Sequence, residues 1–430
     1  MAATQLSLSP TSHFGGRLAV PGDKSISHRY VLLGALAEGT TSIAGLAPGA
    51  DVASSLSCMH AIGAGIVRGG PGAVAIKGRG HHRLAPADGD LDCGNSGTTL
   101  RMLAGIVASH PFRSRLVGDA SLSRRPMRRV IDPLTAMGAT IIARDGRAPL
   151  EIDGAGLTAI DWTPQVASAQ IKSAILLAGL AAHGTTIVRE PLPTRDHTER
   201  AFDLFGITHE SRPGYCAVVG GQWPTAPAGI LRVPGDPSSA AIWSAIAASH
   251  PGWWVEIDGV CLNPLRLGFV QALSRMGAEV RLTETARAGG ELIGTVRVAF
   301  GAPRPAAIGP EMVPSLIDEL PVLAASAALG AGLTVSGAEE LRVKESDRIA
   351  SLALGFRRLG VQMTERPDGF DIEGGQRPTG GEVDAHFDHR LVMAFTVLAL
   401  SATGPTLITG ADAVAVSYPN FHADLLNLCG

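Results

Sequence analysis

The sequence has few cysteines, and none of them stands in a metal-binding or disulfide pattern. Five cysteines are scattered over 430 residues, with no CxxC pair and no Cys/His spacing typical of zinc ligands. An odd number of dispersed thiols excludes a disulfide-stapled scaffold and a structural zinc site. We therefore expect a protein of the reducing cytoplasm that carries no metal.

Charge of either sign is also scarce. Asp, Glu, Lys and Arg make up 17% of the residues and leave a formal net charge of -3. Broad affinity for nucleic acid requires clustered Lys and Arg that neutralise phosphates, so we expect no nucleic-acid partner. Any binding of anions must be local.

We expect no secretory leader and no membrane-spanning apolar run in this sequence. Residues 1–20 contain no basic start followed by an apolar segment. Two long uncharged stretches, 320–338 and 391–411, are interrupted by Gly330 and Gly332 and by the Gly404-Pro405 pair. Each stretch predicts a buried helix followed by a strand, and we expect no association with a membrane.

Six similar segments repeat along the chain at intervals of roughly 70 residues. Each combines an apolar helix, a small-residue stop and a short strand. The segments are 31–43, 103–117, 175–188, 243–257, 323–335 and 395–408. A second, amphipathic helix in each interval ends on a glycine, as helix C-caps often do. These glycines are Gly63, Gly138, Gly206, Gly277, Gly360 and Gly430. Six such units predict an α/β fold assembled by duplication.

The tetrapeptide VPGD occurs twice, at 20–23 and 233–236, and divides the repeats three and three. A Pro/Gly-rich stretch leads into the second copy. We interpret both copies as hinge strands that cross between two lobes. The first lobe is predicted to span 20–231, and the second to combine 1–19 with 232–430.

The residues that precede the six apolar helices are rich in Ser, Asp, Asn and Gly. N-capping of the helices explains these residue types. It does not explain the cations that accompany them, since a cation beside a helix N-terminus is typical of an anion site. These cations are Lys24, Arg29, Arg101, Lys172 and Arg390. The pattern indicates small, multiply anionic ligands bound between the lobes.

Two basic motifs have competing explanations. GDKS lacks the glycine that a phosphate-binding P-loop requires directly before Lys24, because Asp23 stands there. The arginine-rich run at 123–129 fits a solvated surface, and it also fits a phosphate or carboxylate clamp at Arg125.

Two further motifs also leave alternatives open. Lys344, Glu345 and Arg348 lie within one turn, which fits an exposed ion pair of little energetic value as well as a functional site. His389, between Asp388 and Arg390, fits a capping or structural histidine.

Eight motifs, taken in order over essentially the whole chain, resemble the 5-enolpyruvylshikimate-3-phosphate synthase family. They are PGDKSISHR, GNSGTTLR, GDASLSRRPM, ASAQIKSA, SLIDELPVL, LRVKESDR, DHR and SYPNF. ASAQIKSA and GDASLSRRPM resemble the form found in some bacteria rather than the plant-like form. The resemblance implies two lobes of three βαβαββ units each, with the active site in the cleft between them.

The resemblance implies a transferase of the shikimate pathway, which leads to chorismate and the aromatic amino acids. Such an enzyme moves the enolpyruvyl group of phosphoenolpyruvate to the 5-hydroxyl of shikimate 3-phosphate and releases phosphate. It needs no metal or organic cofactor, and glyphosate competes with phosphoenolpyruvate. Small molecules would be its only partners, and we expect a monomer.

The resemblance also implies roles for individual residues. The residues matched to shikimate 3-phosphate binding are Lys24, Ser25, Arg29, Ser168, Ala169, Gln170, Arg195, Asp318 and Lys344. The residues matched to phosphoenolpyruvate binding are Lys24, Asn95, Gly97, Arg125, Gln170, Arg348, His389 and Arg390. Asp318 would take the proton of the 5-hydroxyl, Glu345 would protonate the methylene carbon, and Lys24 would assist. An enol phosphate needs such a separate acid and base, because it does not react with an alcohol until it is protonated.

The chain departs from the family pattern at two positions. Val416 stands where many members have a lysine, so one contact to the phosphate of phosphoenolpyruvate is missing. Ala169 replaces the second serine of the plant-like form, and Arg195 would compensate with its charge.

Two other functions compete with this interpretation. The related UDP-N-acetylglucosamine enolpyruvyl transferases carry a cysteine in a loop that would fall in GDASLSRRPM, which has none. If the chain were a catalytically inactive binding protein for phosphorylated metabolites, Asp318 and Glu345 would have no chemical role.

Overall fold

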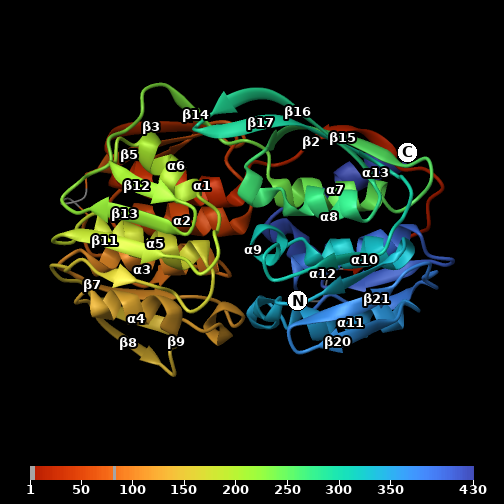
Figure 1. Ribbon diagram of the computed structural model, residues 1–430. Helices are drawn as coiled ribbons and strands as arrows, with labels where there is room; N and C mark the ends of the chain where they lie inside the picture. The colour runs from red at the N-terminus through yellow and green to blue at the C-terminus, as the bar shows by residue number, and fades with distance from the viewer. Residues whose placement is uncertain (1–4, 81–83) are drawn as a thin grey trace. The chain divides into compact units, whose positions relative to one another are not determined.

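The computed structural model describes residues 5–80 and 84–430, which form two compact units (Figure 1). Unit 1 comprises the N-terminal segment through Pro21 together with Pro234–Ala286 and Leu292–Gly430. Unit 2 comprises Gly22–Val233 and Arg287–Glu291. The chain passes from one unit to the other within the two VPGD segments. Residues 1–4, part of the predicted second lobe, lie outside the described residues.

Six apolar helices form the centres of the two units, as the repeats predicted. They are α1 (Lys24–Leu36), α3 (Gly97–Ala108), α5 (Ala169–Gly179), α7 (Pro237–Ala247), α10 (Leu320–Leu329) and α12 (His389–Leu400). Side-chain oxygens cap several of them: Asp23 accepts from the Ile26 N–H at 2.8 Å, and Ser96 accepts from the Thr99 N–H at 3.1 Å. These caps confirm that Ser and Asp before the apolar runs mark helix starts.

Amphipathic helices form the second series, and each ends within two residues of its predicted glycine. They are α2 (Ala50–Ala61), α4 (Arg128–Ala136), α6 (His197–Leu204), α8 (Gly268–Arg275), α11 (Arg348–Arg358) and α13 (Phe421–Cys429). Shorter helices not predicted from the sequence are η2 (Leu122–Arg124), η3 (Pro264–Arg266), α9 (Val313–Leu316), η4 (Glu339–Val343) and η5 (Ala411–Val416).

Unit 2 contains three four-stranded sheets of one pattern, in which a parallel pair is extended by an antiparallel hairpin. Their orders are β14-β3-β5-β4, β6-β7-β9-β8 and β10-β11-β13-β12. The strands are β3 (Glu38–Ala44), β4 (Gly65–Arg68), β5 (Val74–Arg79), β6 (Leu91–Asp92), β7 (Arg113–Val117), β8 (Thr140–Arg144), β9 (Arg147–Asp153), β10 (Asp161–Trp162), β11 (Thr185–Arg189), β12 (His209–Arg212), β13 (Tyr215–Val219) and β14 (Ile230–Arg232).

Unit 1 contains two four-stranded sheets and one three-stranded sheet. Their orders are β16-β17-β15-β2, β18-β19-β21-β20 and β1-β23-β22. The strands are β1 (Gln5–Leu8), β2 (Gly15–Ala19), β15 (Trp254–Cys261), β16 (Glu279–Ala288), β17 (Glu291–Ala299), β18 (Ala306–Ile308), β19 (Gly332–Val335), β20 (Met363–Arg366), β21 (Gly369–Glu373), β22 (Gly381–Asp384) and β23 (Thr406–Thr409). The N-terminal strands β1 and β2 pair with β23 and β15, so they complete sheets built from the second half of the chain.

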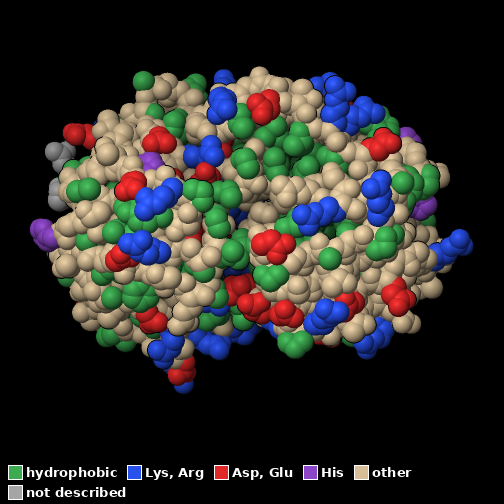
Figure 2. Space-filling view, viewed as in Figure 1, with side chains coloured by type: hydrophobic (Ala, Val, Ile, Leu, Met, Phe, Trp, Pro, Cys, Tyr) green, Lys and Arg blue, Asp and Glu red, His purple; other side chains and the backbone are tan. Residues whose placement is uncertain are grey.

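Each unit buries its apolar helices inside its sheets. Almost every residue of α7, α10 and α12 is buried, which explains why these helices carry no polar face. The uncharged stretches at 320–338 and 391–411 form α10 with β19 and α12 with β23, as predicted. Within the described part of the chain, no helix is both long and apolar enough to cross a membrane. Figure 2 shows basic and acidic side chains interspersed over the visible face, consistent with the net charge of -3.

Candidate functional site

Lys24 opens helix α1 and lies against an acidic residue of the neighbouring helix. Its Nζ is 3.0 Å from Asp51 Oδ2, and Asp51 stands in the first turn of α2. The Lys24 side chain keeps 25% of its exposure, so it is accessible to a ligand. A lysine at a helix N-terminus combines its own charge with the partial positive charge of the helix end.

Asn95 and Arg125 are brought together at the start of α3. The Asn95 side chain accepts from Arg125 Nη2 at 2.7 Å and donates to Asp119 Oδ2 at 2.7 Å. Gly97 is the first residue of α3, and a Cβ built on it would lie 2.6 Å from Arg101 Nη1 and 3.3 Å from Arg125 Nη1. The lack of a side chain at Gly97 therefore leaves room for two guanidinium groups.

Ser168, Ala169 and Gln170 form the start of α5, where all three are partly exposed. Gln170 Oε1 accepts from Arg101 Nη1 at 2.8 Å, and Gln170 Nε2 donates to Thr98 Oγ1 at 2.8 Å. These bonds fix the Gln170 amide between the first turns of α3 and α5.

Arg29 is buried one turn after Ser25 on α1. Its Nη1 donates to the Ser25 carbonyl at 3.0 Å, its Nε to Thr198 Oγ1 at 2.7 Å and its Nη2 to Ser173 Oγ at 2.7 Å. Thr198 belongs to α6, and the partly buried Arg195 lies in the loop just before that helix. The structure therefore connects α1, α5 and α6 around one guanidinium.

The sequence pattern grouped Lys172 with the cations expected at anion sites. The structure excludes Lys172 from that group. Its side chain is 2% exposed, and its Nζ lies 3.0 Å from Glu190 Oε2 and 2.7 Å from Glu199 Oε1. Burial disfavours its charge, but the two glutamates outweigh that effect and raise the pKa of Lys172. A cation enclosed by two carboxylates is not available to a ligand.

Asp318, Lys344, Glu345 and Arg348 gather in unit 1 at the N-terminal ends of α10 and α11. Asp318 Oδ1 lies 3.4 Å from Lys344 Nζ and 3.6 Å from Arg348 Nη1, and Glu345 Oε2 lies 2.5 Å from Arg348 Nη2. Lys344 pairs with Asp318, and Glu345 with an Arg348 that is 2% exposed, so the group differs from the exposed pair between Lys344 and a neighbouring acid that was one alternative. The two carboxylates keep about a fifth of their exposure, which allows both to meet a ligand.

Asp388 fixes Arg348 from the opposite side. Its Oδ2 accepts from Arg348 Nε at 2.9 Å, and its Oδ1 caps α12 by accepting from the Arg390 N–H at 2.9 Å. Burial lowers the pKa of Arg348, but Asp388, Glu345 and Asp318 more than reverse this effect and raise it. The guanidinium is therefore permanently charged.

The two site residues predicted from the DHR motif begin helix α12. His389 and Arg390 are both buried, and Arg390 Nη1 lies 3.7 Å from Glu319 Oε1. Ser238, at the start of α7, also donates to Glu319. The start of α12 is thus linked through Glu319 to the starts of α7 and α10.

Sequence reasoning missed the carboxylates that hold the predicted cations. Asp51 lies outside every motif, and Asp119, Glu319 and Asp388 were expected only as parts of their motifs. The available signal was position, because Asp51 and Asp388 stand at helix starts where an acidic residue also interacts favourably with the helix dipole.

One group of side chains has the composition of a metal site. Ligand atoms of Asp196, His197 and Glu291 lie within 4.8 Å of one another. However, Arg200 contacts Asp196 at 2.9 Å and Glu291 at 3.5 Å, and His197 Nδ1 contacts Glu291 Oε1 at 2.6 Å. A guanidinium already neutralises these carboxylates, so the group is better explained as an ion-pair network.

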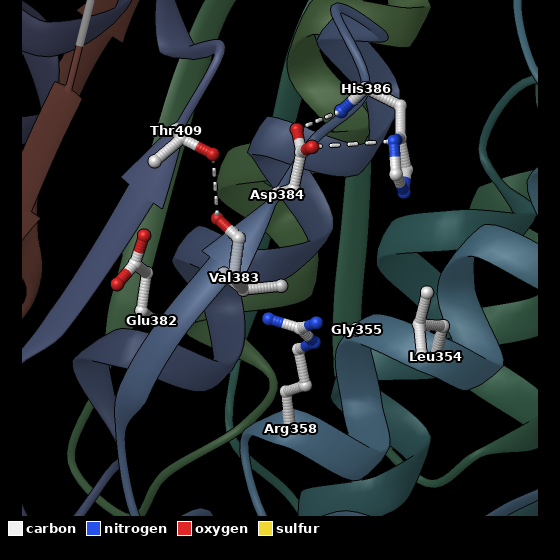
Figure 3. A pocket seen from close by; sticks show the side chains of 8 residues that line it. All are labelled: Leu354, Gly355, Arg358, Glu382, Val383, Asp384, His386 and Thr409. Atoms are coloured by element: carbon white, nitrogen blue, oxygen red, sulfur yellow. Dashed lines mark hydrogen bonds and ion pairs between the residues drawn. The ribbon is translucent and has the colours of Figure 1, made fainter.

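A pocket of roughly 220 Å³ lies in unit 1 beside β22, away from the predicted site residues (Figure 3). Asp384 in this pocket accepts from the His386 N–H at 2.7 Å and lies 3.4 Å from its Nδ1. His386 and Phe387 both adopt positive φ, at 49° and 55°. This turn leads directly into Asp388, but none of the predicted site residues lines the pocket.

Comparison with known proteins gives one consistent result. The family model for EPSP synthase (3-phosphoshikimate 1-carboxyvinyltransferase) matches residues 8–425. A 3-phosphoshikimate 1-carboxyvinyltransferase of Acidithiobacillus ferrooxidans is 49% identical over 422 residues, covering 98% of this chain and 96% of that protein. The corresponding protein of Koribacter versatilis is 47% identical over 97% of both chains.

A solved structure is similar over almost its full length. The EPSP synthase of Acinetobacter baumannii superposes with a TM-score of 0.86 at 40% identity, covering 99% of this chain and 98% of that chain. The match therefore extends through both units.

Proposed function

This chain belongs to the EPSP synthase family, and on that premise we propose how its residues carry out the family's reaction. The chain is a 3-phosphoshikimate 1-carboxyvinyltransferase of the shikimate pathway. It transfers the enolpyruvyl group of phosphoenolpyruvate to the 5-hydroxyl of shikimate 3-phosphate and releases phosphate.

The observation that carries the proposal is the arrangement of two carboxylates around Arg348. Glu345 Oε2 lies 2.5 Å from one of its terminal nitrogens, and Asp318 Oδ1 lies 3.6 Å from the other. Addition to an enol phosphate needs a proton donor for the methylene carbon and an acceptor for the hydroxyl proton. Glu345 is the donor and Asp318 the acceptor in this proposal.

Arg348 also couples substrate binding to the acid. When the anionic groups of phosphoenolpyruvate bind this guanidinium, they compete with Glu345 for it. A carboxyl group released from a cation holds a proton more readily. Binding of phosphoenolpyruvate would thus free Glu345 from its ion pair with Arg348.

In this proposal, residues of both units bind the two substrates. Lys24, Asn95, Gly97, Arg125 and Gln170 of unit 2 bind phosphoenolpyruvate, with Arg348, His389 and Arg390 of unit 1. The residues assigned to shikimate 3-phosphate are Lys24, Ser25, Arg29, Ser168, Ala169, Gln170, Arg195, Asp318 and Lys344. Arginines suit phosphate and carboxylate ligands, because the planar guanidinium donates two parallel hydrogen bonds.

Carboxamide substitutions test the acid and the base. We expect Asp318→Asn and Glu345→Gln each to lower kcat by about 100-fold or more, because each removes a proton-transfer group while keeping its size. Their effect on the dissociation constant of shikimate 3-phosphate should be several-fold at most. Phosphate release measures kcat, and calorimetry measures binding.

The control is Glu339→Gln, an exposed glutamate in the adjacent η4, which should keep normal turnover. Near-normal turnover of either active-site variant would refute the role assigned to it. Phosphate release with UDP-N-acetylglucosamine in place of shikimate 3-phosphate would instead support the related transferase.

The proposal also includes an inhibitor, the oligomeric state and the cellular location of the protein. Glyphosate competes with phosphoenolpyruvate at the Gly97 end of α3, and the protein acts as a monomer in the cytoplasm. The location is supported by the five cysteines, all of which are free thiols, as a reducing compartment would leave them.

A further inference from the structure

Lys172 lies at the centre of a buried ionic cluster that joins three elements of unit 2. It extends from α5 to Glu190, directly after β11, and to Glu199 on α6. Side-chain exposure is 2% for Lys172, 4% for Glu190 and 7% for Glu199. Removing one member of a buried ion group strongly destabilises the charges that remain, so such a cluster holds its elements in a fixed arrangement.

Glu190 also closes the loop that carries Arg195. Its Oε1 accepts from the Thr194 hydroxyl, and its Oε2 lies 3.5 Å from the Thr194 backbone nitrogen. The Glu190 N–H is itself fixed to the Gly214 carbonyl at 2.8 Å. The residue before Arg195 is therefore bound to the ionic cluster by its side chain.

The first turn of α6 fixes the other side of this loop. Its three residues bind three different segments: His197 contacts Glu291 at 2.6 Å, Thr198 accepts from Arg29 at 2.7 Å, and Glu199 contacts Lys172 at 2.7 Å. All three residues are buried. Arg195 is thus separated from a rigid turn by Asp196 alone.

The same elements determine the orientation of Arg29. Ser173, the neighbour of Lys172 on α5, accepts from Arg29 Nη2 at 2.7 Å and lies 2.6 Å from Thr198 Oγ1. The two hydroxyls that hold Arg29 therefore come from residues adjacent to Lys172 and Glu199. A shift in the cluster would move both guanidinium groups at once.

We propose that Lys172, Glu190, Glu199 and Thr194 are positioning residues, which orient Arg195 to receive the phosphate of shikimate 3-phosphate and keep Arg29 in place through Ser173 and Thr198. This inference rests on the proposed function, in which both arginines bind that substrate. A phosphate is recognised by guanidinium groups held in a fixed geometry, so the effect should depend on the phosphate rather than on the shikimate ring.

The decisive variant is Thr194→Val, which keeps the shape of the side chain and removes the hydroxyl that links the loop to Glu190. Lys172→Met is less suitable, because it would leave two buried carboxylates unneutralised and could prevent folding. Calorimetry on the full chain should measure dissociation constants for shikimate 3-phosphate and for unphosphorylated shikimate. We expect Thr194→Val to weaken binding of the phosphorylated ligand about 5- to 10-fold, as for one lost hydrogen bond, and binding of shikimate less than 2-fold.

Two further variants separate positioning from general damage. Thr194→Ser restores the hydroxyl and should recover most of the affinity for shikimate 3-phosphate. Thr186→Val removes another buried hydroxyl of unit 2, one with no hydrogen-bond partner among the described residues, and should change neither constant. Equal losses for the two ligands, or no loss in Thr194→Val, would overturn the inference.

Arg195→Gln distinguishes this inference from the function on which it rests. If Arg195→Gln leaves the affinity for shikimate 3-phosphate unchanged, the assignment of Arg195 to that substrate fails. If Arg195→Gln weakens binding and Thr194→Val does not, the assignment stands and the positioning role is wrong.

Discussion

At the scale of single residues, Arg348 of the candidate site is stabilised by acidic partners rather than by solvent. Arg348 contacts Asp388, Glu345 and Asp318 while almost completely buried. Its guanidinium donates to Asp388 through two different nitrogens, which a lysine ammonium cannot reproduce. Both proposed proton-transfer groups therefore depend on one side chain for their position and charge.

His28 on α1 should make the stability of unit 2 sensitive to mildly acidic pH. Burial, and then the charges of Lys24 and Arg29, lower the pKa of His28 well below 6.5. The folded chain keeps this ring neutral at pH values where the unfolded chain protonates it. The stabilisation is therefore complete above pH 6.5 and is lost below it, by at most about 1.4 kcal/mol per pH unit.

Urea unfolding at pH 7.5 and 5.5 checks this expectation. His28→Gln removes the titrating ring, so the variant should lose about 1 kcal/mol less than the wild type over this interval. His183→Gln, at an exposed histidine of the same unit, should behave like the wild type. Identical losses in all three proteins would contradict the role of His28.

Gly97→Ala should discriminate between glyphosate and phosphoenolpyruvate. The added methyl would lie 2.6 Å from Arg101 Nη1 and 3.3 Å from Arg125 Nη1, so both side chains must shift. Both ligands should lose affinity, but glyphosate, the longer one, should lose about 10-fold more, since a steric clash penalises the larger ligand. The inhibition constant and the Michaelis constant, measured on both proteins, decide the matter, and equal increases would show that Gly97 does not border the glyphosate site.

At the scale of elements, the hairpin of β16 and β17 differs from the other hairpins of the fold. Its strands belong to a sheet of unit 1, whereas its tip, Arg287–Glu291, belongs to unit 2. Gly289 and Gly290 form the turn with positive φ of 59° and 73°, which glycine adopts without strain. Arg200 binds the Gly290 carbonyl at 2.7 Å, and Glu291 is buried against His197.

Glu291 should make attachment of this tip dependent on pH. Burial raises the pKa of Glu291. The hydrogen bond and charge of His197, together with the charge of Arg200, lower it by more, so the pKa lies below 4.5. Because the folded pKa is the lower one, the stabilisation is complete above pH 4.5 and is lost as the pH falls through the folded pKa.

Hydrogen exchange of residues 287–291 measures the attachment. At pH 7, Glu291→Gln should lower their protection about 10-fold or more, since it weakens a charge-assisted hydrogen bond. The wild type should show a comparable decrease only in acid. Glu279→Gln, at the exposed start of β16, is the matched control, and unchanged protection in Glu291→Gln would show that other contacts hold the tip.

The sequence predicted the regular elements well because each leaves a local signal. Apolar runs and glycine stops located both series of helices, and Asp or Ser located their starts. Lys172 was misassigned because its partners, Glu190 and Glu199, are distant in sequence, and nothing local shows that a lysine on an apolar helix is paired. The assignment of residues 287–291 to unit 2 was not predicted for the same reason, since their contacts with Arg200 and His197 form only in the folded chain.

At the scale of the whole molecule, the sixfold repeat explains why polar site residues cluster at helix starts. Each repeat places one apolar helix inside its unit, and the first turns of these helices carry Lys24, Gly97, Gln170 and Arg390. Duplication therefore supplied several helix N-termini, which later changes could equip with different cations and acids. The sequence motifs identified these residues. The structure also shows which carboxylates contact the cations among them.

The pairing of β1 with β23 and of β2 with β15 has a consequence for synthesis of the chain. Residues 22–233 can fold as soon as they leave the ribosome, because nearly all of unit 2 is contiguous. Strand β1 must wait for residues 406–409, which at about 5–20 residues per second takes roughly 20 to 80 seconds. During that time the edge of β1 is unpaired and open to association with other chains.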